Sequence, residues 1–96
     1  MEYTFHPAAE AELNEAVDYY ESIQPGLGID FSQEAYKATI RAVEHPKAWS
    51  IIREPIRRSL LKRFPYGILY SETTAGIHIL AVMNLHREPF YWLSRQ

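Results

Sequence analysis

The sequence predicts an α+β fold in which an N-terminal helical hairpin packs on a small antiparallel β-sheet, in the order β-α-α-β-β-β. Apolar residues recur at helical steps of three and four between Pro7 and Pro25 and between Asp30 and Pro46. After Pro46 the chain is rich in β-branched and aromatic residues, which favour strands. A length of 96 residues supports one modest core, so we expect a single domain over residues 1–96. Two such layers bury their apolar sides against each other.

The first helix is predicted from a short strand, a proline and an apolar stripe. Residues 3–5 are of β type, and Pro7 suits the first turn of a helix, where its missing N–H costs nothing. The stripe consists of Ala9, Leu13, Ala16, Val17 and Tyr20. Residues 25–28, with their proline and two glycines, end this helix and form a turn.

The second helix is predicted to begin at Asp30 and to stop before Pro46. Asp30 is a good N-cap, and Gln33 lies three residues later, as in a capping box. The apolar stripe consists of Phe31, Ala35, Ala38 and Ala42. The residue before a proline avoids the helical region, so Pro46 ends the helix. Because few residues join the two helices, an antiparallel helical hairpin is expected.

Strand-forming segments follow Pro46. They are residues 51–52, 56–64, 66–71 and 77–85, with a hairpin turn expected at 73–76. The segment from residue 77 onward is apolar on both alternating faces, which predicts a central strand covered on at least one side.

Composition excludes several classes of site. The chain has no cysteine, which rules out disulfides, thiolate zinc sites, iron–sulfur clusters and a cysteine nucleophile. His6, His45 and His78 have no partner at metal-ligand spacing, so no metal site is predicted. No apolar run is long enough to span a bilayer, and no signal segment is seen. We therefore expect a cytoplasmic protein without a membrane partner.

Charge is divided unequally along the chain. Residues 1–48 hold nine acids and three bases, whereas residues 49–96 hold three acids and seven bases. The densest basic cluster consists of Arg53, Arg57, Arg58, Lys62 and Arg63. Such a cluster could bind an anionic partner. Two alternatives stay open: a solvated edge strand, in which bases discourage aggregation, and pairing of these bases with the acidic first helix.

A second candidate cluster follows the last strand. His86 could move a proton near neutral pH, Arg87 could hold a phosphate, and Tyr91 could donate a proton or stack on a base. The alternative is a strand-end turn with an internal ion pair of Arg87 and a core tyrosine. Three acids of the first helix are interpreted as a solvated face: Glu10, Glu12 and Glu15.

Several stretches together resemble the toxins of the RelE/ParE superfamily, the plasmid stabilization proteins of toxin–antitoxin pairs. They are Phe5-His6-Pro7-Ala8-Ala9, Tyr19-Tyr20-Glu21, Arg57-Arg58-Ser59, Phe64-Pro65-Tyr66-Gly67 and Leu85-His86-Arg87-Glu88-Pro89. The resemblance covers nearly the whole chain. It implies two helices on an antiparallel sheet, a cytoplasmic location, no cofactor, and neutralisation by a cognate antitoxin.

The resemblance implies one of two activities. RelE-like members are ribosome-dependent, metal-independent mRNA endoribonucleases, and ParE-like members poison DNA gyrase. Gly67 aligns with a catalytic arginine of the nucleases, Arg87 matches an arginine after the last strand, and Tyr91 lies near the catalytic tyrosine. The nuclease lysines have only Arg57, Arg58 and Lys62 as nearest equivalents.

The missing arginine at Gly67 favours a ParE-like, growth-inhibiting toxin that acts on gyrase. The target-binding residues are then Arg57, Arg58, Lys62, Arg63 and Arg87. If the chain is instead a nuclease, the catalytic residues are Arg87, Tyr91 and His86. A weakly toxic antitoxin-binding module is a third interpretation. Whether the chain is an enzyme, and whether it forms a homodimer, stays open at this point.

Overall fold

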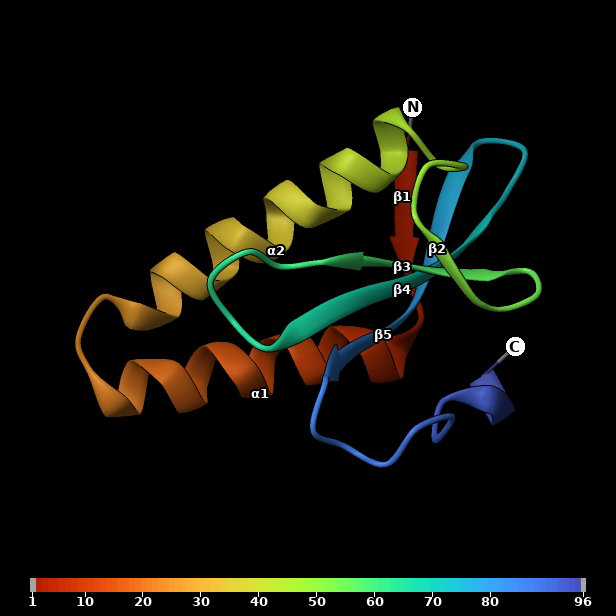
Figure 1. Cartoon of the computed structure of the whole chain (residues 1–96). Helices are drawn as coiled ribbons and strands as arrows, with labels where there is room; N and C mark the ends of the chain where they lie inside the picture. The colour runs from red at the N-terminus through yellow and green to blue at the C-terminus, as the bar shows by residue number, and fades with distance from the viewer. Residues whose placement is uncertain (1, 96) are drawn as a thin grey trace.

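A computed structural model describes residues 2–95 and confirms the α+β fold (Figure 1). The elements, in order, are β1 Glu2–Phe5, α1 Pro7–Ile23, α2 Leu27–Glu44, β2 Ser50–Arg53, β3 Ile56–Leu60, β4 Tyr66–Glu72, β5 Gly76–Asn84 and a 3-10 turn at Leu93–Arg95. The predicted hairpin turn lies between β4 and β5, where the Thr73 amide donates to the Gly76 carbonyl.

The sheet differs from the expected one in two respects. It contains five strands in the order β1-β5-β4-β3-β2, because the short segment around residues 51–52 forms a strand of its own. It is also mixed, because β1 pairs in parallel with β5 while the other neighbours are antiparallel. A strand as short as β1 carries no sequence signal for its direction. The central position of β4 and β5 agrees with their apolar sequences.

Each face of the sheet has its own apolar layer. The helical hairpin covers one face and buries the two predicted helical stripes against residues such as Ile68 and Ile79. The chain after β5, dark blue in Figure 1, loops back beside the sheet, and Trp92 packs on the other face against residues such as Leu69 and Leu80. The C-terminal segment is therefore part of the folded core.

Helix α1 begins as the sequence predicts. Pro7 is its first residue, and the His6 ring acts as N-cap because its Nδ1 accepts from the Ala8 amide at 3.0 Å. This contact satisfies one of the amides that the start of a helix leaves without a partner.

The N-cap of helix α2 lies four residues before the predicted one, so the assignment of Asp30 as N-cap is wrong. Gly26 occupies the cap with a φ of 89°, which favours glycine. The Glu21 carboxylate accepts from the amides of Gly26 and Gly28 at 3.0 Å each. A Cβ atom at Gly28 would lie 2.7 Å from the Val17 carbonyl oxygen, so glycine permits the close approach of the two helices. The side chain that accepts from the first amides of α2 therefore belongs to α1.

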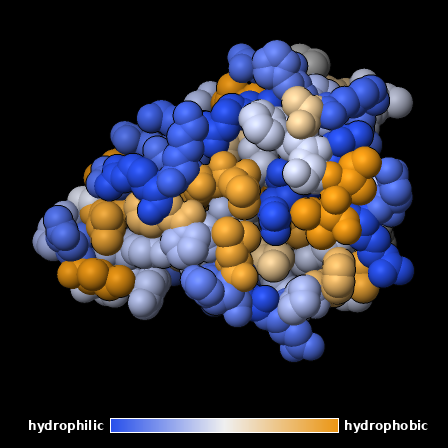
Figure 2. Space-filling view, in the orientation of Figure 1, coloured by the Kyte–Doolittle hydropathy of each residue, from blue (hydrophilic) through white to orange (hydrophobic). Residues whose placement is uncertain are grey.

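Large hydrophobic side chains also reach the surface. Figure 2 shows hydrophobic residues lying among hydrophilic ones on one side of the molecule. Among residues 2–95 the exposed ones are Tyr3, Tyr19, Ile23, Ile29, Tyr36, Ile51, Leu60, Leu85 and Phe90. They are spread over both helices, three strands and the C-terminal segment. Single exposed hydrophobic residues are normal, so they do not by themselves locate a site.

Tyr70 on β4 makes the fold sensitive to alkali. Its ring is fully buried, and its hydroxyl donates to the Pro46 carbonyl at 2.8 Å. Burial raises the pKa of Tyr70 from 10.0 to about 12. The folded state thus favours neutral Tyr70, and this stabilisation is complete below pH 10 and is lost as pH rises through about 12.

We expect the free energy of unfolding to fall by about 2 kcal/mol between pH 10 and 12 through Tyr70. Urea unfolding across this range measures the slope. Tyr70→Phe is the matched variant, because it keeps the ring and removes the ionisable group, and its slope should be shallower. An identical slope in both proteins would mean that other groups cause the loss of stability at high pH.

Candidate functional site

The predicted cations Arg57 and Arg58 lie on opposite faces of the sheet. The neighbouring Ser59 hydroxyl donates to the Ala38 carbonyl of α2 at 2.8 Å, so odd-numbered residues of β3 face the helices. Arg57 lies on this side and donates from Nη1 to the Trp49 carbonyl at 2.8 Å. Arg58 points to the other face, where its side chain lies against Gly67.

Two further predicted cations follow the end of β3, which is shorter than expected and stops at Leu60. Lys62 is exposed, and its backbone amide donates to the buried Glu34 carboxylate at 3.2 Å. Arg63 lies 3.6 Å from Asp30 in an ion pair that is exposed on both sides. A pair of this kind contributes roughly 0–1 kcal/mol. The predicted binding residues therefore do not form one continuous basic face.

The residues after β5 are brought together with α1. His86 is exposed in the turn, where its amide donates to the Asn84 side chain at 2.9 Å. The Arg87 guanidinium lies 3.7 Å from the centre of the Tyr91 ring, a cation–π contact. Its Nη1 is 3.4 Å from Oε2 of Glu12. The alternative of an internal ion pair for Arg87 is thus realised, with an acid of the first helix.

Glu12 is the centre of this cluster, so its interpretation as part of a solvated face is wrong. Its side chain is only 10% exposed. Oε1 accepts from the Val82 amide of β5 at 3.0 Å and from Nη1 of Arg95 at 2.9 Å. Oε2 accepts from the Tyr91 hydroxyl at 2.7 Å and from Nη2 of Arg95 at 3.0 Å. One carboxylate therefore joins α1, β5 and the C-terminal segment.

Sequence reasoning missed both Glu12 and Arg95. A signal for Glu12 was present, because it lies three residues after Ala9 and four before Ala16, and both alanines are buried. Arg95 had no comparable signal, since its position follows from the course of the C-terminal turn. Its Nη1 also donates to the Leu80 carbonyl at 3.0 Å, which fixes the guanidinium against β5.

The contacts of the Glu12 cluster favour the protonated forms of Tyr91 and Arg95. Burial, together with the hydrogen bond to Glu12, raises the pKa of Tyr91, so its hydroxyl stays protonated. The hydrogen bond to Glu12 likewise raises the pKa of Arg95, despite the opposing effect of burial. A neutral tyrosine and a permanently charged arginine thus face a single carboxylate.

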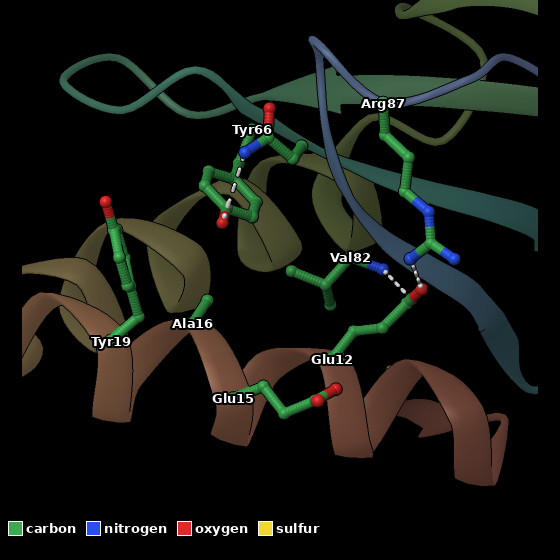
Figure 3. Close-up of a pocket in the computed structure, with 8 residues that line it drawn as sticks. Glu12, Glu15, Ala16, Tyr19, Tyr66, Val82 and Arg87 are labelled. Atoms are coloured by element: carbon green, nitrogen blue, oxygen red, sulfur yellow. Dashed lines mark hydrogen bonds and ion pairs between the residues drawn. The ribbon is translucent and has the colours of Figure 1, made fainter.

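A pocket of about 250 Å³ opens beside this cluster (Figure 3). Its lining residues are Glu12, Glu15, Ala16, Tyr19, Tyr66, Val82, Asn84 and Arg87. Figure 3 shows Arg87 reaching toward Glu12 at one end, with the rings of Tyr66 and Tyr19 toward the other. The Arg87 side chain is 52% exposed and can reach a ligand there. The Tyr91 hydroxyl could contact such a ligand only if its hydrogen bond to Glu12 were broken.

Among residues 2–95, no group of three or more His, Asp or Glu side chains is placed to hold a metal ion. In the same part of the chain, no helix is both long and apolar enough to cross a membrane.

Comparison with known proteins shows the fold. No family model and no curated protein sequence matches the chain. A solved structure described as "Chromosomal ParDE TA system from P. aeruginosa" is similar, with a TM-score of 0.76 and 20% sequence identity. The match covers 90% of this chain and 97% of that chain. The expected RelE/ParE-type fold is thereby confirmed.

Proposed function

We propose that this chain is the toxin of a type II toxin–antitoxin system, inhibits growth through DNA gyrase in the ParE manner, and is neutralised by a cognate antitoxin. The observation that carries this proposal is the fold likeness to a chain of a ParDE system over 90% of the present chain. The sequence resemblance, which also extends over nearly the whole chain, supports the same proposal.

The geometry disfavours the alternative of an mRNA endoribonuclease. At Gly67, where the nucleases carry an arginine, a Cβ atom would lie 2.9 Å from Cγ of Arg58. The Arg58 side chain thus occupies the space that a larger residue would need. The Tyr91 hydroxyl already donates to Glu12, and burial raises its pKa, so Tyr91 is a weak acid that is poorly suited to donate a proton to a substrate. Of Arg87 and Tyr91, the two candidate catalytic residues that contact Glu12, only Arg87 has a half-exposed side chain that a phosphate could reach.

The antitoxin is expected to cover the basic residues near β3 and the free edges of the sheet. Edge strands pair readily with incoming segments, and cations suit acidic side chains. The edges of this sheet are β1 and β2. A protein that binds its antitoxin but is harmless by itself remains the third interpretation, and toxicity separates it from the first two.

Expression of the chain without an antitoxin should arrest growth, and purified protein should inhibit supercoiling by gyrase. Growth arrest with blocked supercoiling and unimpaired translation supports the ParE-like proposal. Uninhibited supercoiling at saturating protein would remove gyrase as the target. Cleavage of ribosome-bound mRNA in a translation reaction would instead establish the nuclease, and harmless expression would favour the binding module.

A further inference from the structure

A second pocket lies beside the end of β3 and belongs to neither the Glu12 cluster nor the pocket next to it. It has a volume of about 320 Å³, which is room for about ten water molecules. It is lined by Arg41, Trp49, Ser50, Arg58, Leu60, Leu61 and Lys62. Strand β2 pairs with β3 only as far as Arg58, so the edge of β3 beyond this residue is not covered by a strand.

Three cations converge on this pocket: Arg41, Arg58 and Lys62. No acidic side chain lines it. Among residues 2–95, none of the three forms an ion pair, whereas Arg63, Arg87, Arg95 and Lys47 all do. An excess of unpaired positive charge in one concave place, in a chain whose net charge is −2, favours an anionic ligand.

Parts of the pocket are fixed before any ligand arrives. Nη2 of Arg41 donates to the Leu60 carbonyl at 2.9 Å, and the Trp49 indole donates to the Arg41 carbonyl at 3.1 Å. The Arg58 side chain lies against Gly67, and its Nε is buried without a hydrogen-bond partner. Positioned donors lose little entropy on binding, which favours a specific contact over a diffuse attraction.

The surroundings favour a carboxylate over a nucleic-acid backbone. A nucleic acid presents many phosphates in a row and needs a stripe of free cations. Here Arg57 is turned toward the helices, and Arg63 and Arg87 are paired with acids of their own chain. The cations that line this pocket therefore form a small group and not a long row. Trp49 and the half-exposed Leu60 add an apolar wall, which suits the mixed acidic and apolar side chains of a polypeptide.

We propose that this pocket binds the carboxylate side chains of an acidic segment from a partner polypeptide. Arg41, Arg58 and Lys62 hold the carboxylates, while Trp49 and Leu60 contact an apolar residue beside them. The identification of this partner with the antitoxin rests on the proposed function, whereas the chemistry of the site does not.

The test uses the full chain with its tryptophan indoles observed by ¹⁵N NMR. The probe is a capped octapeptide in which Glu alternates with Leu and Phe, and the control is the same peptide with Gln in place of Glu. We expect the Glu peptide to shift the Trp49 indole signal, assigned by its loss in Trp49→Phe, and to leave that of Trp92 in place. The Gln peptide should bind at least about tenfold more weakly, since charge-assisted hydrogen bonds are lost.

Two variants report on the site itself. Lys62→Gln should weaken binding of the Glu peptide by about three- to tenfold, because one of three cations is lost. The matched control is Lys37→Gln, which makes the same charge change at an exposed position of α2 outside the pocket. An unchanged Trp92 signal verifies that each variant is folded.

Several results would overturn the proposal. They are equal binding of the Glu and Gln peptides, equal loss in Lys62→Gln and Lys37→Gln, and no Trp49 shift at millimolar peptide. If a single-stranded oligonucleotide shifted the Trp49 signal at lower concentration than the Glu peptide, the preferred ligand of the pocket would be a phosphate and not a carboxylate. Because this assay uses purified protein and no cells, its failure leaves the growth and supercoiling tests unaffected.

Discussion

Replacement of Glu12 by alanine should lower the free energy of unfolding by about 3 kcal/mol. The Glu12 carboxylate accepts five hydrogen bonds, one from a backbone amide of β5 and four from side chains of the C-terminal segment. Its removal leaves the Arg95 guanidinium, which is 15% exposed, without a charged partner. Removal of one member of a buried ion pair costs roughly 3–5 kcal/mol, and the slight exposure here places the effect at the lower end.

Urea unfolding of Glu12→Ala against the unmodified chain measures this loss. The matched control is Glu15→Ala, because Glu15 lies one turn further along α1 and lines the same pocket, and its side chain forms no hydrogen bond among residues 2–95. It should change stability by less than about 0.5 kcal/mol. Equal losses in the two variants would mean that helix α1, and not the cluster, is responsible.

A coupling measurement distinguishes the cluster from a set of independent contacts. Glu12→Gln keeps one acceptor oxygen and should cost less than Glu12→Ala. When Glu12→Ala is combined with Tyr91→Phe, the double variant should cost less than the sum of the single effects, since both substitutions remove the same 2.7 Å hydrogen bond. Such coupling would show that Glu12 of α1 helps to hold the C-terminal segment on the fold.

The sequence alone predicts most of the fold because burial leaves a periodic pattern. The stripe Phe31, Ala35, Ala38 and Ala42 is buried throughout, as its spacing indicates. The start of α2 escaped prediction for a physical reason: its cap is supplied by Glu21, which belongs to the other helix. Local capping rules cannot detect a partner that only the tertiary fold brings near.

The candidate site was less predictable than the fold. Neighbouring residues of a strand, such as Arg57 and Arg58, point to opposite faces, but this alternation does not say which face the helices cover. The sequence also cannot show that Arg41, more than fifteen residues before Arg58, lines the same pocket. Both facts depend on how the hairpin lies on the sheet. A basic cluster in sequence thus became separate groups in space.

The packing of that hairpin can be tested at Phe31, whose replacement by alanine should lower the free energy of unfolding by about 3–5 kcal/mol. The ring is fully buried and lies 5.2 Å from Tyr20, 5.1 Å from Phe64 and 4.8 Å from Tyr66, measured between ring centres. Alanine removes these aromatic contacts and leaves a cavity where α1, α2 and the turn after β3 meet.

The matched control lies on the same helix at Tyr36, which is 58% exposed. Tyr36→Ala removes a ring of similar size but should cost less than about 1 kcal/mol, since little area is buried there. The midpoint of urea unfolding measures both variants, provided that the m-value stays constant. If Phe31→Ala were no more costly than Tyr36→Ala, the aromatic cluster would not be what holds the helices to the sheet. The positions of Arg41 in its pocket and of Glu12 in its cluster would then need another support, because both depend on that packing.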